Sequence, residues 1–156
     1  MGKRSSFTSI WLKLGLLIVV LALSFKVSRI YAFRNQGKVC CGQACFLVDL
    51  AITAQERSKG LMFRRKMARD QGMLFIYKDE QIRFFWMKNT YLPLDLVWLD
   101  SDRKVIGVTP DVRPCLKDNC TRYSSPCPAQ YVLEINAGMA EKKGVKPGLE
   151  CVFVLE

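Results

Sequence analysis

The chain has 156 residues, about half of them hydrophobic, and a formal net charge of +10 at pH 7. This length and composition suit one domain with a single hydrophobic core. The sequence contains no histidine, which excludes Ser-His-Asp and Cys-His nucleophile pairs, imidazole acid–base catalysis and every metal site with a histidine ligand. Any catalysis would have to use Lys, Asp, Glu, Tyr, Ser or Cys side chains.

Residues 1–34 differ from the rest of the chain, because they contain six basic residues and no acidic one around an apolar run at residues 14–25. Residues 10–25 are fewer than the roughly 20 that cross a bilayer comfortably, so a cleaved signal peptide and a retained signal anchor both stay open. We favour a transmembrane signal anchor. The domain after it is then expected on the extracytoplasmic side, either anchored to the membrane through residues 10–25 or exported.

The excess positive charge belongs largely to this N-terminal segment. Because six of the 24 basic residues and none of the 14 acidic residues lie there, residues 35–156 carry a net charge of only +4. The densest basic cluster in that part, at residues 57–69, is interpreted as a solvated surface of a helix and turn, and the alternative is a dedicated anion site. No nucleic-acid recognition motif accompanies it, so nucleic acid is not predicted as a partner.

Cysteines occur at positions 40, 41, 45, 115, 120, 127 and 151. Such a density after an export-type segment predicts disulfide bonds in an oxidising compartment, and the odd count leaves at least one cysteine unpaired or in an intermolecular bond. Spacing does not determine the connectivity, but Cys115 and Cys120 lie in one short loop, and we predict a bridge between them. Cys151 is interpreted as a buried small hydrophobe. Neither a metal site nor a cofactor is predicted, because no C-x-x-C pair is present.

After a cysteine-containing linker at residues 35–45, the sequence predicts one compact domain over residues 46–156. Residues 46–52 alternate as a strand, and Thr53 with Glu56 forms a capping box for a short helix that ends near Gly60. Further strands are predicted at residues 72–77, 83–88, 94–100, 104–112, 130–136 and 150–155, and one helical turn at residues 138–143. This pattern predicts a mainly β domain: an antiparallel jelly-roll-like sandwich or open barrel with one or two short helices, preceded by a hydrophobic anchor.

A series of motifs follows along the chain. They are Glu56-Arg57, GLMFR at residues 60–64, GMLF at residues 72–75, FWMKNT at residues 85–90, PLD at residues 93–95, and YVLE at residues 131–134 with Gly138. In these motifs the sequence resembles the domain of unknown function 192 family over about residues 46–155. The resemblance implies a compact, mostly β, jelly-roll-like domain, often behind a signal peptide or anchor, and no established activity. The cysteines at positions 40, 41, 45 and 127 depart from the plainest family pattern.

The FWMKNT and PLD motifs place charged side chains in an otherwise apolar segment. Strands at residues 83–88 and 94–100 would form a hairpin with Lys88 near Asp95, and a buried lysine requires such a partner. We predict a polar notch that binds a ligand. Its residues are Arg57, Arg64, Trp86, Lys88, Asn89, Thr90 and Asp95. The alternative is that the charge pair and the turn residues only hold the register of the hairpin.

Different functional classes stay open. We favour a non-catalytic binding or interaction module that uses the notch to hold a small polar ligand, an envelope polymer or a partner protein. The alternative is a hydrolase or transferase acting on envelope glycan or peptide-like substrates, with Asp95 or Glu134 as general base. Glycosidase chemistry would require two carboxyl groups about 5–9.5 Å apart in one cleft, whereas Glu134 is expected outward on its strand or beside a helix arginine. A redox role of Cys115 and Cys120 is a third interpretation.

Overall fold

The computed structural model of the chain describes residues 35–155. Of these, residues 36–155 belong to one compact unit that begins at Gln36. The predicted anchor, including the apolar residues 10–25, lies outside the described residues. Between residues 35 and 155, no helix has the length and apolar character that a membrane span requires.

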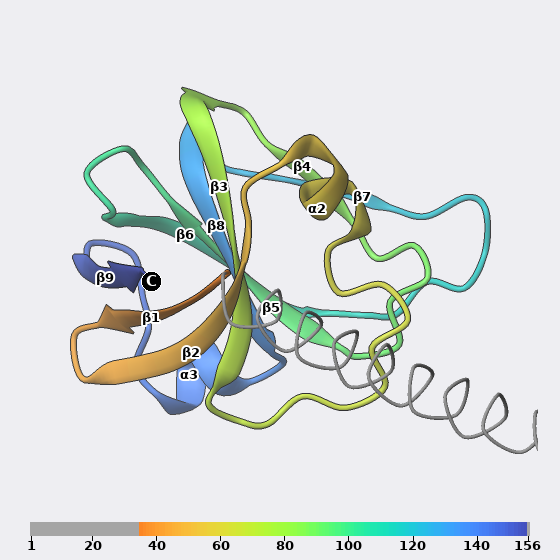
Figure 1. The fold of residues 1–156 in the computed structure, drawn as a ribbon, viewed down its shortest axis with the longest axis horizontal. Helices are drawn as coiled ribbons and strands as arrows, with labels where there is room; N and C mark the ends of the chain where they lie inside the picture. Colours follow the sequence, from red (N-terminus) through yellow and green to blue (C-terminus); the bar gives the residue numbers. More distant parts are fainter. Residues whose placement is uncertain (1–34, 156) are drawn as a thin grey trace, which may run out of the picture. The chain divides into compact units, whose positions relative to one another are not determined.

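A seven-stranded sheet, in the order β6-β5-β8-β3-β2-β1-β9, forms most of the domain (Figure 1). Its strands in chain order are β1 (Gln36–Cys41), β2 (Ala44–Ala51), β3 (Gln71–Gln81), β5 (Leu94–Leu99), β6 (Val105–Val112), β8 (Ala129–Asn136) and β9 (Cys151–Leu155). A second, two-stranded sheet pairs β4 (Phe84–Trp86) with β7 (Arg122–Ser124). Among the described residues the helices are α2 (Ala54–Lys59) and α3 (Met139–Lys142). The predicted mainly β fold with short helices is confirmed.

The main sheet is antiparallel except at one pair. Strands β2 and β3 run parallel, which requires a crossover connection, and α2 with the turns after it supplies that connection. An isolated bridge between Lys104 and Glu150 links the segments before the edge strands. Within residues 35–155, β6 and β9 do not pair with each other, so the sheet stays open.

The two faces of the main sheet carry separate hydrophobic clusters. The first cluster includes Phe46, Leu74, Val97, Leu133 and Ile135. The second includes Phe75, Phe85, Leu96, Trp98 and Val132. Strand β5 is buried at all six positions, because it lies between β6 and β8 and both of its faces are covered. A polar side chain on these central strands is therefore buried on either face, and it needs a partner or a cavity.

Two strands lie where the sequence predicted none. Residues 35–45 were predicted as a linker, but β1 pairs with both β2 and β9, and β2 begins at Ala44. The prediction of a linker at residues 35–45 is wrong, because β1 forms through long-range hydrogen bonds to other strands and has no local alternation that would have indicated it. Strand β7 was also missed, because it has only three residues and its ladder with β4 joins segments far apart in the chain.

The predicted hairpin between residues 83–88 and 94–100 does not form. Strand β4 pairs with β7 in the small sheet, and β5 pairs with β6 and β8 in the main sheet. The hydrophobic residues of β5 are buried on both faces only in the interior of the large sheet, which explains this pairing. Lys88 and Asp95 consequently have different partners.

Disulfides join Cys40 to Cys45, Cys41 to Cys151, and Cys115 to Cys120. The first two connect residues that are direct partners on neighbouring strands. The third is the bridge that the short loop predicted. The interpretation of Cys151 as a simple hydrophobe is wrong, although its side chain is buried. Cys127 is exposed and unpaired among the described residues.

Candidate functional site

A cavity of about 80 Å³ opens beside the second cluster, between α2, β3 and the small sheet. We name it the Glu134 pocket. It is lined by residues 57–62, Phe75, Tyr77, Phe84–Trp86, Lys88, Thr90 and Glu134. Helix α2, the turn after it, both sheets and the FWMKNT motif therefore all contribute residues to one cavity.

Helix α2 is positioned by its own sequence. The Thr53 hydroxyl accepts a hydrogen bond from the Glu56 amide, and the Glu56 carboxylate accepts one from the Thr53 amide. This is the predicted capping box, which satisfies two amides of the first turn. The helix ends at Gly60, whose φ of 46° favours glycine. A Cβ there would also lie 3.2 Å from the ring of Phe75 in the pocket wall.

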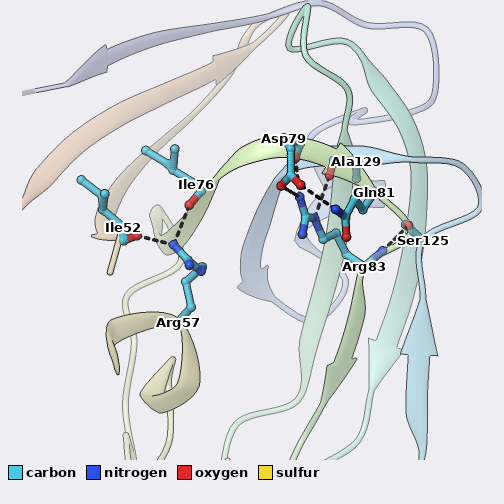
Figure 2. Close-up of polar contacts among 8 residues, drawn as sticks. All are labelled: Ile52, Arg57, Ile76, Asp79, Gln81, Arg83, Ser125 and Ala129. Atoms are coloured by element: carbon cyan, nitrogen blue, oxygen red, sulfur yellow. Dashed lines mark hydrogen bonds and ion pairs between the residues drawn. The ribbon is translucent and has the colours of Figure 1, made fainter. Parts of the chain in front are cut away.

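Arg57 connects α2 to the main sheet. Its Nη1 donates hydrogen bonds to the carbonyl oxygen of Ile76, at 3.1 Å, and to that of Ile52 (Figure 2). Its guanidinium lies 4.8 Å from the centre of the Tyr77 ring. Among residues 35–155, its Nε and Nη2 have no acceptor, so part of the cationic fork is left for another group.

Arg83 contacts the same tyrosine and is held more firmly. Its guanidinium lies 3.8 Å from the Tyr77 ring centre and donates to Ala129 and to the Asp79 carboxylate, at 2.9 and 2.8 Å (Figure 2). The pKa of Tyr77 is raised, mainly by burial, while both arginines act in the opposite direction. Tyr77 therefore stays a neutral wall of the pocket.

Glu134 is the acidic side chain of the pocket. It lies on β8 between Met73 of β3 and Leu96 of β5, and only 4% of it is exposed. Among residues 35–155 its carboxyl has no hydrogen bond or ion pair. Every fully buried side-chain oxygen of that region has a hydrogen-bond partner. Because the Glu134 carboxyl has none, it is not fully buried, and it retains access to the pocket. The expected outward orientation is wrong, because both faces of β8 are covered. The other expectation placed Glu134 beside a helix arginine, and Arg57 of α2 does line the same pocket, although no ion pair joins the two among the described residues.

The burial of Glu134 changes its chemistry. Desolvation raises the pKa of its carboxyl from an ordinary value of 4.5 to about 8. At neutral pH the group is therefore mostly a neutral acid. A neutral carboxyl can donate one hydrogen bond as well as accept others.

Lys88 and Thr90 are held by the loop that follows β6. Both form isolated bridges with Cys115, whose disulfide to Cys120 closes that loop. The Lys88 ammonium lies 3.4 Å from the Asp118 carboxylate and 5.8 Å from the centre of the Trp86 ring. The Asp118 side chain is fully exposed, so this ion pair contributes little.

Four of the seven predicted site residues line the pocket, namely Arg57, Trp86, Lys88 and Thr90. Arg64 instead forms an ion pair with Asp49 of β2. Asn89 shapes the turn: its φ is 54°, its carbonyl accepts from Phe63 and its amide donates to Cys115. The structure does not bring Arg64 or Asn89 into the pocket wall.

Asp95 has a structural position on the other face of the sheet. Its carboxylate is buried and accepts hydrogen bonds from the amides of Asp111, Gly138 and Ala140, at 2.9, 3.1 and 2.9 Å. It thereby connects β5 to β6 and to the start of α3. The predicted Lys88–Asp95 pair is absent from the described residues, because the hairpin that would create it does not form.

Asp95 and Glu134 do not share a cleft. The register pairs Asp95 with Ile135, which packs in the first cluster, and pairs Glu134 with Leu96, which packs in the second. The two carboxyl groups consequently point to opposite faces of the sheet. A two-carboxylate glycosidase mechanism requires both groups around one substrate, so this pairing is excluded as an active site.

Sequence reasoning missed the aromatic walls and the inward position of Glu134. Phe75 and Tyr77 alternate on β3, so a common face for them could have been read from the spacing. Glu134 is the single acid in an apolar strand, a pattern that also fits an outward residue. In residues 35–155 no three His, Cys, Asp or Glu side chains form a group that could hold a metal ion.

Comparisons with known proteins agree with the fold. A family model described as "Uncharacterized ACR", domain of unknown function 192, matches residues 38–153. A crystal structure from Sinorhizobium meliloti 1021, provisionally described as a transcription regulator, is 34% identical, with a TM-score of 0.69; the match covers 76% of this chain and 92% of that one. A protein of unknown function from Novosphingobium aromaticivorans DSM 12444 is 33% identical, with a TM-score of 0.67, over 75% and 83% of the two chains. A comparison with curated proteins found no match.

Proposed function

The chain belongs to the domain of unknown function 192 family, which brings no established activity with it, and we propose that its domain is a non-catalytic binding module with the Glu134 pocket as its ligand site. One observation carries the proposal: a buried carboxyl without a protein partner faces a cavity. Leaving a buried polar group without a partner costs about 1–3 kcal/mol. A ligand that hydrogen-bonds to Glu134 would recover this cost.

The rim of the pocket supports recognition of a larger molecule. Phe84 and Trp86 stay 64% and 43% exposed beside the cavity, and exposed aromatic side chains are common at binding sites. Pockets for complete drug-sized ligands measure about 300–1,000 Å³, several times the volume here. The pocket therefore takes one functional group of a ligand, and the aromatic rim contacts the adjoining part.

Export or membrane anchoring is part of the proposal. Three disulfides within residues 36–155 favour an oxidising compartment. The ligand would then be met outside the cytoplasm, as a small polar molecule, an envelope polymer or a protein. The provisional description of the Sinorhizobium relative belongs to that protein, and the +4 net charge of residues 35–156 gives little support to nucleic acid as a ligand here.

Native mass spectrometry of the full-length, oxidised protein tests the proposal. The protein is incubated with an envelope extract beside Lys88→Met, which changes the pocket, and Lys142→Met, which changes an exposed lysine of α3. We expect a discrete added mass on the parent protein and on Lys142→Met, and at least a tenfold weaker signal on Lys88→Met. Equal adducts on all three proteins, or none on any, would contradict the proposed site.

A further inference from the structure

The charges around the Glu134 pocket have one predominant sign. Arg57 and Lys59 of α2 and Lys88 after β4 are cationic, and Glu134 of β8 is the acid among the lining residues. Tyr77 of β3 is the other titratable group of the lining, and β5 contributes none. With Glu134 protonated the lining carries three positive charges, and with Glu134 ionised it still carries a net two.

The cationic groups are arranged to receive an acceptor. The Nη1 of Arg57 is held by two backbone carbonyls, and the Tyr77 ring stacks against the guanidinium. This fixes the plane of the fork while Nε and Nη2 stay without acceptors among residues 35–155. Such a fork matches the two oxygens of a carboxylate. Within the part of the chain that the structure describes, Lys88 has only the fully exposed Asp118 as ion-pair partner, so a ligand can replace that contact at small cost.

Building on the proposed function, we infer that the Glu134 pocket binds the carboxylate of an organic acid or peptide whose apolar part rests on Phe84 and Trp86. Arg57 and Lys88 hold the carboxylate, and the protonated Glu134 donates a hydrogen bond to it. The cavity of about 80 Å³ suits one carboxylate and the adjoining carbon atoms. A cationic group would meet three positive side chains and would have to ionise a buried acid.

Probes of one shape and different charge test this inference. The full-length, ¹⁵N-labelled, oxidised protein is titrated at pH 7 with 3-phenylpropanoate, 3-phenylpropanamide and 3-phenylpropylamine. The indole N–H signal of Trp86 reports binding at the rim, and that of Trp98, which is buried and bonded to Thr109, is an internal reference. We expect the carboxylate to bind at least about tenfold more tightly than the amide, since a charge-assisted contact is lost with the charge. The amine should bind more weakly still.

The source of the carboxylate is distinguished by a peptide pair. N-acetyl-Ala-Ala-Phe with a free C-terminus is compared with its C-terminal amide in the same titration. Tighter binding of the free peptide than of 3-phenylpropanoate indicates a peptide C-terminus as the ligand. Tighter binding of 3-phenylpropanoate indicates a small organic acid.

Two variants connect the binding to the pocket. Lys88→Met should weaken carboxylate binding about tenfold, whereas Lys142→Met on α3 should leave it unchanged. Between pH 7 and pH 9, wild-type affinity for the carboxylate should fall about tenfold as Glu134 loses its proton. Glu134→Gln should flatten this pH profile, because glutamine keeps a neutral donor.

The outcomes separate this inference from the proposed function. Preferred binding of the amine, or equal binding of acid and amide, would overturn the anion inference and leave the pocket as a ligand site. Failure of every probe to move the Trp86 signal would also overturn the inference, and the envelope-extract experiment then decides on the pocket itself.

Discussion

Replacing Glu134 with glutamine removes a titratable group from the pocket and keeps the shape of the side chain. In the folded wild type the pKa of Glu134 is raised to about 8, and burial is the cause. Because this folded pKa lies above the ordinary value of 4.5, the folded state binds the proton more tightly than the unfolded state. The contribution of that proton to stability is complete below pH 4.5 and is lost as the pH rises through 8.

The magnitude follows from the shift. One pKa unit corresponds to about 1.4 kcal/mol. The raised pKa of Glu134 therefore lowers the free energy of unfolding by about 1 kcal/mol at pH 5, about 3 kcal/mol at pH 7 and about 4 kcal/mol at pH 8. With 4% exposure the group has little solvent screening. Glutamine carries no such cost. The advantage of Glu134→Gln in free energy of unfolding should therefore grow by about 3 kcal/mol between pH 5 and pH 8.

Urea unfolding of the oxidised, full-length protein at pH 5, 6, 7 and 8 measures this difference, with circular dichroism as the signal. Glu150→Gln is the matched control, because Glu150 is an exposed glutamate before β9. Its pH profile should run parallel to that of the wild type. Parallel profiles for wild type and Glu134→Gln as well would refute the assignment of a buried, proton-binding Glu134.

Two other substitutions test the framework of the fold. Asp95→Ala leaves three backbone amides, one buried and two partly buried, without their acceptor and should lower the free energy of unfolding by about 3–5 kcal/mol, whereas Asp49→Ala, at a surface ion pair, should cost less than about 1 kcal/mol; equal losses in urea would contradict the structural role of Asp95. Removing the Cys41–Cys151 bridge, whose sequence separation is 110, should cost about 5 kcal/mol, against about 2 kcal/mol for Cys40–Cys45 with a separation of 5. Equal losses for the two double alanine variants would be inconsistent with loop closure as the main effect.

The functional site was only partly predictable, because its residues come from segments that meet through long-range pairing. Lys88 and Trp86 were found as unusual residues in an apolar motif, and Arg57 as a helix residue nearby. The PLD motif that follows includes Asp95, yet that carboxylate lies on the other face of the sheet and holds backbone amides. Two residues that are close in the sequence can have side chains on opposite faces of a sheet, because successive side chains along a strand alternate between the two faces.

Local interactions explain what the sequence by itself determined. Thr53 and Glu56 form the capping box, and Gly60 ends the helix, because the partners are a few residues apart. Period-two alternation likewise identified most strands of the main sheet, and the short Cys115–Cys120 loop indicated its bridge.

Only the tertiary structure decided the neighbours of each strand and the faces that are covered. Strand β1 is ordered by β2 and β9, and β5 lies in the sheet interior instead of pairing with β4. Glu134 is buried because strands on both sides and α2 with the small sheet enclose its face. An acid in an apolar strand looks the same in sequence whether that face meets water or a neighbouring layer, and the packing of distant segments makes the difference.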